Sequence, residues 1–149
     1  MQSRGKSLLR ALLPLATLLW LAFILTRSMK SGAASHAESS STLTLLQRIA
    51  PFLTMRFVRK FAHFFEFFVL GGLLLADFRL FGCRRLVWPA LLGLLATCAD
   101  ELIQRFVPAR SGELADVLLD FSGVLAGCLA AVGAWTLVRR RRKGARDLV

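Results

Sequence analysis

The sequence predicts an all-α, polytopic membrane protein with four transmembrane helices and an outer interfacial segment. Its apolar runs are nearly continuous and close to bilayer length, whereas a soluble core would show amphipathic periods. The chain is 56% hydrophobic, and its basic residues gather at the ends of the apolar runs, which is the membrane pattern. The net charge of +11 therefore predicts contact with a lipid bilayer and not with nucleic acid. We expect one membrane domain over residues 1–149.

The first span is expected at residues 8–26, behind Arg4, Lys6 and Arg10. A cleaved signal peptide is the alternative, because Ser35-His36-Ala37 resembles a cleavage site, although it lies far beyond the apolar run. Residues 27–42 are rich in Ser, Ala and Gly and predict a flexible loop. Residues 43–58 have helical apolar spacing but are short and charged, so they predict an interfacial or re-entrant helix.

The remaining spans are predicted at residues 61–81, 86–107 and 117–138, with a basic tail at 139–149. Gly71-Gly72 in the second span and the pair Gly123 and Gly127 in the fourth would allow close helix contact. The three cysteines have no metal-like or redox-like spacing, and we interpret them as small buried residues. With the N-terminus inside, twelve basic residues lie inside and eight outside, which predicts that both termini are cytoplasmic.

Polar side chains occur near the outer ends of the second, third and fourth spans. The spacing of three or four residues within each group puts its members on one helix face, and the hairpin connectivity brings the groups to one side. Carboxylates at this depth need partners, for which Lys60, Arg105 and Arg110 are available. Structural ion pairs are the simpler interpretation, and Asp116 could cap the fourth helix. Asp77 and Glu113 are interpreted as ordinary interfacial charges. The candidate ligand-binding residues are Lys60, His63, Glu66, Asp100, Glu101, Gln104, Arg110, Asp116 and Asp120.

Over residues 56–130 the chain resembles the VanZ-like family of small bacterial membrane proteins. The resemblance rests on a K-x-x-H-x-x-E pattern that ends at Glu66 and on DELIQRFVPAR, which begins at Asp100. Asp116-Val117 and Gly123 continue it. The chain departs from the pattern at Phe67, where the family usually has Tyr, and at Asp120, where it usually has Asn. The resemblance implies a multi-pass protein of the bacterial inner membrane with an envelope role, and its namesake is associated with teicoplanin resistance.

Two functions follow as hypotheses. The first is a non-enzymatic envelope protein whose outer cluster binds a lipid headgroup, a cell-wall precursor or a glycopeptide. The second is a membrane hydrolase or transferase for a lipid or phosphate substrate, with a metal ion held through His63 and Glu66 and with Glu101 as general base. Its catalytic candidates are His63, Glu66, Asp100 and Glu101. A lone His and the lack of a nucleophile motif weigh against it, and we assign no cofactor, metal ion or oligomeric state from the sequence. A transporter ranks last, because no chain of charges crosses the midplane.

Overall fold

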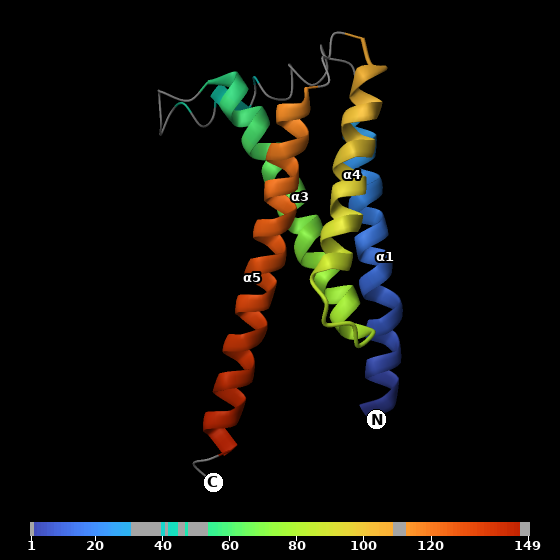
Figure 1. The fold of residues 1–149 in the computed structure, drawn as a ribbon, viewed down its shortest axis with the longest axis vertical. Helices are drawn as coiled ribbons and strands as arrows, with labels where there is room; N and C mark the ends of the chain where they lie inside the picture. Colours follow the sequence, from blue (N-terminus) through green and yellow to red (C-terminus); the bar gives the residue numbers. More distant parts are fainter. Residues whose placement is uncertain are drawn as a thin grey trace.

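The computed structural model describes residues 2–30, 40, 42–44, 47, 54–108 and 113–146. Its long helices are α1 (Gln2–Ser28), α3 (Met55–Leu80), α4 (Val87–Arg105) and α5 (Leu114–Arg146). They run alternately up and down, so that both termini lie at one end of the bundle (Figure 1). The described residues contain no strand, which confirms the all-helical prediction.

Three helical segments are long and apolar enough to cross a membrane, namely Ser7–Ser28, Met55–Leu80 and Leu114–Arg141. The protein is therefore embedded in a membrane. Helix α4 falls short of this criterion, since Asp100, Glu101 and Gln104 lie within its 19 residues and lower its mean hydropathy. The predicted span at residues 86–107, and with it the total of four spans, thus stays a prediction.

Helix bounds differ from the expected spans at several ends. Helix α3 begins at Met55 and takes up the last residues of the expected interfacial segment, because the hydroxyl of Thr54 caps it by accepting a hydrogen bond from the Phe57 N–H at 3.3 Å. Half of that segment lies outside the described residues. Helix α5 continues to Arg146, well into the expected basic tail, because Arg and Lys are good helix formers and suit a helix C-terminus.

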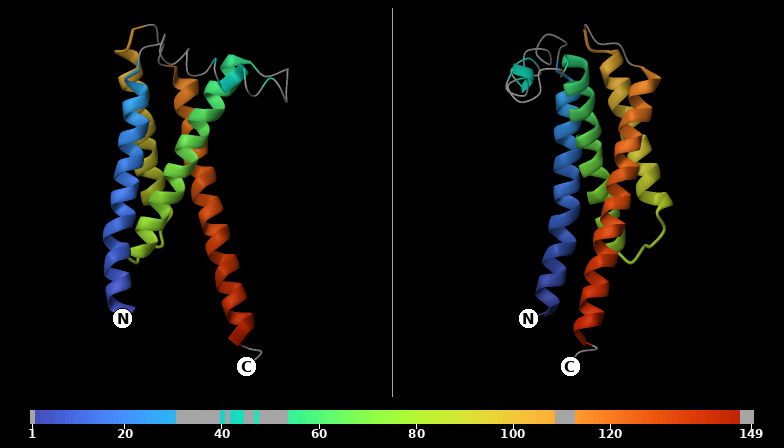
Figure 2. Two further views of the ribbon diagram at one scale, coloured as in Figure 1. Left: turned by 180° about the vertical axis from the view of Figure 1, so that it is seen from behind. Right: turned by 90° about the vertical axis from the view of Figure 1, so that its left-hand side faces the viewer.

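Helices α3 and α5 cross with their backbones in close contact, as the views in Figures 1 and 2 show. A Cβ atom at Gly123 would come within 2.5 Å of the Phe64 carbonyl oxygen, and one at Gly127 would collide with the Phe68 carbonyl oxygen. Glycine is therefore required at these two positions, as the sequence pattern indicated. The buried core beside this crossing consists of Ile24, Phe67, Leu70, Leu75, Val124 and Cys128.

Helix α1 is attached to α3 by two hydrogen bonds. The Trp20 indole N–H donates to the Glu66 carbonyl oxygen at 2.9 Å, and the Thr17 hydroxyl donates to the Asp77 carboxylate at 2.7 Å. Asp77 therefore holds two helices together, and its interpretation as an ordinary interfacial charge was wrong. Of the cysteines, Cys128 is buried but Cys98 is exposed on α4, so the expectation of small buried residues holds for only part of the set.

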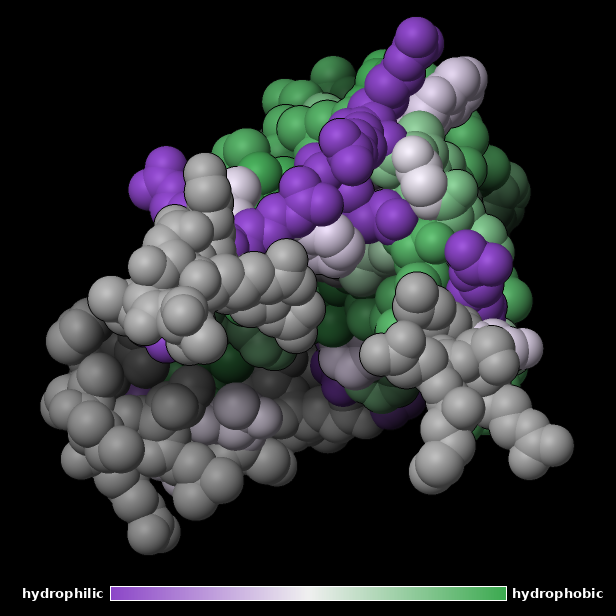
Figure 3. Space-filling model, turned by 90° about the horizontal axis from the view of Figure 1, so that it is seen from below, coloured by the Kyte–Doolittle hydropathy of each residue, from purple (hydrophilic) through white to green (hydrophobic). Residues whose placement is uncertain are grey.

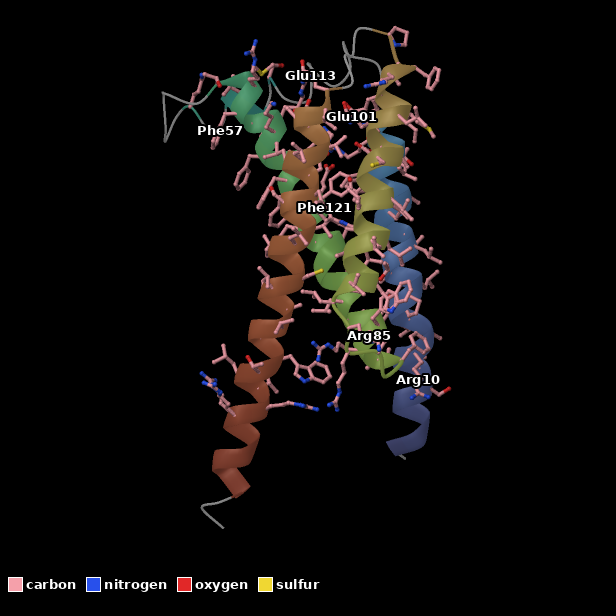
Figure 4. The ribbon with its side chains drawn as sticks, in the orientation of Figure 1. Arg10, Phe57, Arg85, Glu101, Glu113 and Phe121 are labelled. Carbon is pink, nitrogen blue, oxygen red and sulfur yellow. The ribbon has the colours of Figure 1, made fainter. Side chains whose placement is uncertain are left out.

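The two ends of the bundle differ in charge. Arg10 and Arg85 lie toward the end that carries the termini, whereas Glu101 and Glu113 lie toward the opposite end (Figure 4). Figure 3 looks onto the terminal end and shows a band of hydrophilic side chains between hydrophobic flanks. The acidic candidate residues are therefore separated from the arginines of the terminal end by the apolar part of the bundle.

Candidate functional site

The candidate residues lie where the start of α3, the end of α4, the start of α5 and the end of α1 come together. Connectivity explains this, because each helical hairpin returns the chain to the same end (Figure 1). Arg110 lies outside the described residues, so its predicted role is not addressed by the structure. Arg105 is exposed on α4 and makes no ion pair with the described part of the chain.

The outermost contact joins α3 and α5. The Lys60 ammonium lies 2.6 Å from the Asp116 carboxylate, and both side chains are partly exposed. Asp116 also lies in the first turn of α5, where a negative charge favours the helix dipole. The pair therefore fixes the entry of α5 against α3.

Asp100 is 0% exposed and accepts hydrogen bonds from two helices. The Gln104 side-chain amide on the same helix donates to it at 2.7 Å, as the spacing of four predicts. The second donor is the hydroxyl of Ser28 at the end of α1. Both oxygens of this carboxylate are thus oriented by protein donors.

Glu66 makes an ion pair with α1. Its carboxylate lies 2.9 Å from the Arg27 guanidinium, with side chains 11% and 38% exposed, respectively. This ion pair engages the carboxylate that the second hypothesis pairs with His63 as a metal ligand. The hydrogen bond from Trp20 to the Glu66 carbonyl strengthens the same contact between α1 and α3.

Glu101 joins α4 to the segment that leads into α5. One of its carboxylate oxygens accepts a hydrogen bond from the backbone N–H of Glu113 at 2.6 Å. The other oxygen is buried and has no hydrogen-bond partner among the described residues. Glu113 thus contributes through its backbone, and Glu101 positions the first turn of α5.

The centre of the cluster is formed by His63, Asp100 and Asp120, one residue from each of three helices. One ligand atom of each lies within 4.8 Å of the other two. The His63 Nδ1 atom lies 3.9 Å from the Asp120 carboxylate, which is longer than a hydrogen bond. Asp120 is 2% exposed, and its Oδ1 atom has no hydrogen-bond partner in the described part of the chain.

Two hollows adjoin this centre. A polar pocket of about 10 Å³, which is room for one water molecule, is lined by Arg59, Lys60, His63, Gln104, Asp116, Leu119 and Asp120. An open apolar groove of about 450 Å³ is lined by Thr54, Arg56, Phe57, Lys60, Phe61, Phe64 and Leu119. Lys60 and Leu119 line both hollows, so the groove and the pocket are neighbours.

Two parts of this site were not predicted from the sequence. Ser28 and Arg27 were assigned to the loop after the first span, where polar residues are unremarkable. The groove could have been anticipated from Phe57, Phe61 and Phe64, which recur at helical spacing at the start of α3.

Apolar helices of bilayer length and a buried acidic cluster near one end of their bundle define a helical membrane protein with an embedded polar site. A family model described as VanZ/LLP1 matches residues 13–138. The chain therefore belongs to the VanZ/LLP1 family, which confirms the resemblance found in its sequence. The match includes most of α1, the helix that supplies Ser28 and Arg27. No curated protein and no solved structure matches the chain.

Proposed function

We propose that this protein binds a phosphate-bearing lipid of the bacterial cell envelope, such as a lipid-linked cell-wall precursor. The observation that carries the proposal is that the apolar groove and the polar pocket lie side by side, with Lys60 and Leu119 in the lining of both. A lipid has the same two parts, a long apolar chain and a charged headgroup. Ligand pockets of a few hundred Å³ with apolar walls and few polar groups suit such a molecule.

Charge supports a phosphate as the headgroup. Arg56, Arg59 and Lys60 follow one another in the first turns of α3 and line the groove or the pocket. Arginine binds phosphate in bidentate fashion, and the N-terminal end of a helix favours an anion. Phe57, Phe61 and Phe64 provide the apolar wall on the same helix. One helix would therefore contact both parts of the lipid.

For this role we propose four transmembrane helices in the bacterial inner membrane, with both termini inside. Helix α4 has 19 residues and a length of about 28 Å, close to the thickness of the hydrocarbon core. Its carboxylates Asp100 and Glu101 are buried, whereas Leu91, Leu95 and Leu102 are exposed toward the surroundings. Lipid would therefore meet an apolar surface, and the cluster would lie at the outer face.

Cysteine labelling tests this orientation. Cys83, in the turn between α3 and α4, should react with a membrane-impermeant maleimide only after permeabilisation, in a Cys98→Ser background that leaves the buried Cys128 in place. A Glu113→Cys substitution in a chain that also carries Cys83→Ser and Cys98→Ser should be labelled in intact cells. The reverse labelling pattern would place the site on the cytoplasmic face.

Lipid binding is tested with a polyprenyl phosphate and the matching polyprenol, each added to the purified protein and observed by native mass spectrometry. We expect the phosphate to bind at least about ten times more tightly, because two or more charge-assisted contacts are lost with the alcohol. Arg56→Gln combined with Arg59→Gln should remove this preference. The matched control is Arg84→Gln with Arg85→Gln in the α3–α4 turn, which should keep it. Equal binding of phosphate and alcohol would contradict the proposal.

A hydrolase or transferase that acts on such a lipid is the second candidate. It is favoured by the position of His63 beside Asp120 on the wall of the polar pocket, where an imidazole could take a proton from water. Of its other candidates, Glu66 and Glu101 already make contacts with α1 and with the start of α5. Release of phosphate from the bound lipid over time distinguishes this candidate from simple binding. The family resemblance also implies an effect on teicoplanin resistance. Teicoplanin susceptibility should therefore be measured in cells that express the same variants.

A further inference from the structure

We propose that His63, Asp100 and Asp120 form a binding site for one divalent transition-metal ion, Mn²⁺ or Zn²⁺, between α3, α4 and α5. The site goes beyond the proposed lipid binding and does not depend on it. Each of the three helices supplies one ligand, so an ion there would also hold the helices together.

The separations of the three side chains suit an ion better than direct hydrogen bonds. Two ligands of one ion can lie up to about 4.2 Å apart, since each metal–ligand distance is about 2.1 Å. The His63 Nδ1 and Asp120 Oδ2 atoms, at 3.9 Å, are within this limit although they are too far apart for a hydrogen bond. The three ligand atoms all lie within 4.8 Å of one another. Bringing the most distant pair within about 4.2 Å therefore needs a side-chain movement of less than about 1 Å.

Asp120 provides an independent sign of a ligand. Its side chain is almost completely buried, and its Oδ1 atom has no hydrogen-bond partner among the described residues. A buried carboxylate oxygen without a partner is costly, so such atoms call for a water molecule or an ion. A cation bound by both carboxylate oxygens of Asp120 would satisfy Oδ1 and would also contact Oδ2, the oxygen that lies 3.9 Å from the His63 Nδ1 atom.

Asp100 is already oriented as a metal ligand. The Ser28 hydroxyl and the Gln104 amide each donate a hydrogen bond to one of its oxygens. Each carboxylate oxygen has two acceptor positions, so one remains for an ion. Hydrogen bonds of this kind hold metal-binding side chains in place and raise metal affinity.

The charge balance also favours a cation. In the part of the chain that the structure describes, neither Asp100 nor Asp120 has a Lys or Arg within 4 Å. The nearby cations are engaged elsewhere, since Lys60 pairs with Asp116 and Arg27 pairs with Glu66. Glu101 adds a further buried carboxylate nearby. Negative charges at this depth repel one another and are poorly solvated, and a divalent ion would offset two of them.

The donor set indicates which ion binds. One imidazole nitrogen with two carboxylates suits Mn²⁺ or Zn²⁺, whereas Ca²⁺ and Mg²⁺ prefer oxygen ligands alone. Three protein ligands leave a coordination position for water. The polar pocket, lined by His63 and Asp120, has room for one water molecule at this position.

Metal content after loading tests the site. The purified protein is incubated with MnCl₂ or ZnCl₂, desalted and analysed by inductively coupled plasma mass spectrometry. We expect about one ion per chain in the wild type and at least about tenfold weaker retention in His63→Leu and Asp120→Asn. The control is Asp77→Asn, which changes a partly buried carboxylate far from the cluster and should retain the ion. Retention by all variants, or by none including the wild type, would overturn the proposal.

A second measurement needs no variant, so a folding defect in His63→Leu or Asp120→Asn cannot obscure the answer. Pulsed electron paramagnetic resonance of Mn²⁺ bound to the wild type should show coupling to one imidazole nitrogen. Bound Mn²⁺ without nitrogen coupling would place the ion elsewhere and overturn the assignment. Because this readout uses the metal alone, it stands or fails separately from the polyprenyl phosphate experiment.

Discussion

Gly127→Ala should lower the stability of the helix bundle by about 3 kcal/mol or more, a large effect for one added methyl group. The new Cβ would collide with the Phe68 carbonyl oxygen and lie 3.0 Å from the Gly72 backbone nitrogen. Both neighbours are backbone atoms of α3, which cannot move aside as a side chain can. The whole α3–α5 crossing would have to open, and the loss should appear as a lower midpoint in thermal unfolding monitored by size-exclusion chromatography.

Gly133→Ala is the matched control for this prediction. Gly133 lies on the same helix, and a Cβ atom there meets nothing within 4 Å. Its substitution should not destabilise the bundle and should raise stability by about 0.5 to 1 kcal/mol, because Ala is a better helix former than Gly. Equal unfolding midpoints for the two variants would show that α3 and α5 are farther apart than described.

The helical fold could be predicted because a bilayer constrains the chain so strongly. Apolar runs of about 20 residues have few solutions other than spanning helices. Gly123 and Gly127 further indicated which surface of the last helix makes the closest contact. The helix ends were less predictable, because they depend on local contacts such as the Thr54 cap and not on the apolar pattern.

The candidate site was predictable to the extent that helix periodicity and hairpin connectivity determine it. Lys60 with Asp116 joins the second and fourth predicted spans, and Gln104 with Asp100 follows from a spacing of four. The direction of each carboxylate was not predictable. Whether Glu66 turns toward His63 or toward α1 depends on how α1 packs, and helix packing leaves no signal in the spacing of polar residues.

The contribution of α1 to the site was therefore the main feature that the sequence did not predict. A Ser and an Arg at the end of an apolar run are typical of any span boundary, where they face headgroups and water. In this fold the end of α1 lies beside the cluster, so that Ser28 contacts Asp100 and Arg27 contacts Glu66. Only the packing of α1 against α3 and α4 distinguishes these residues from ordinary boundary residues.

Arg27→Met is the variant that tests this contribution, and we expect it to destabilise the bundle by about 1 to 2 kcal/mol, between the values for exposed and for buried ion pairs. The value is intermediate because the Arg27 side chain is partly exposed, whereas the Glu66 carboxylate is nearly buried and loses the Arg27 guanidinium. Arg10→Met is the control on the same helix, because Arg10 is an exposed residue near the other end. The unfolding midpoint of Arg10→Met should match that of the wild type.

A second substitution separates the ion pair from general packing by α1. Glu66→Gln removes the charge that Arg27→Met leaves behind, so the double variant should be more stable than Arg27→Met alone, with a coupling energy of about 1 to 3 kcal/mol. Additive losses in the two single variants would mean that Arg27 and Glu66 act independently. Coupling between them would instead show that α1 is held to α3 by charge at the membrane depth where Asp100, Glu101 and Asp120 lie, which makes α1 a structural part of the site.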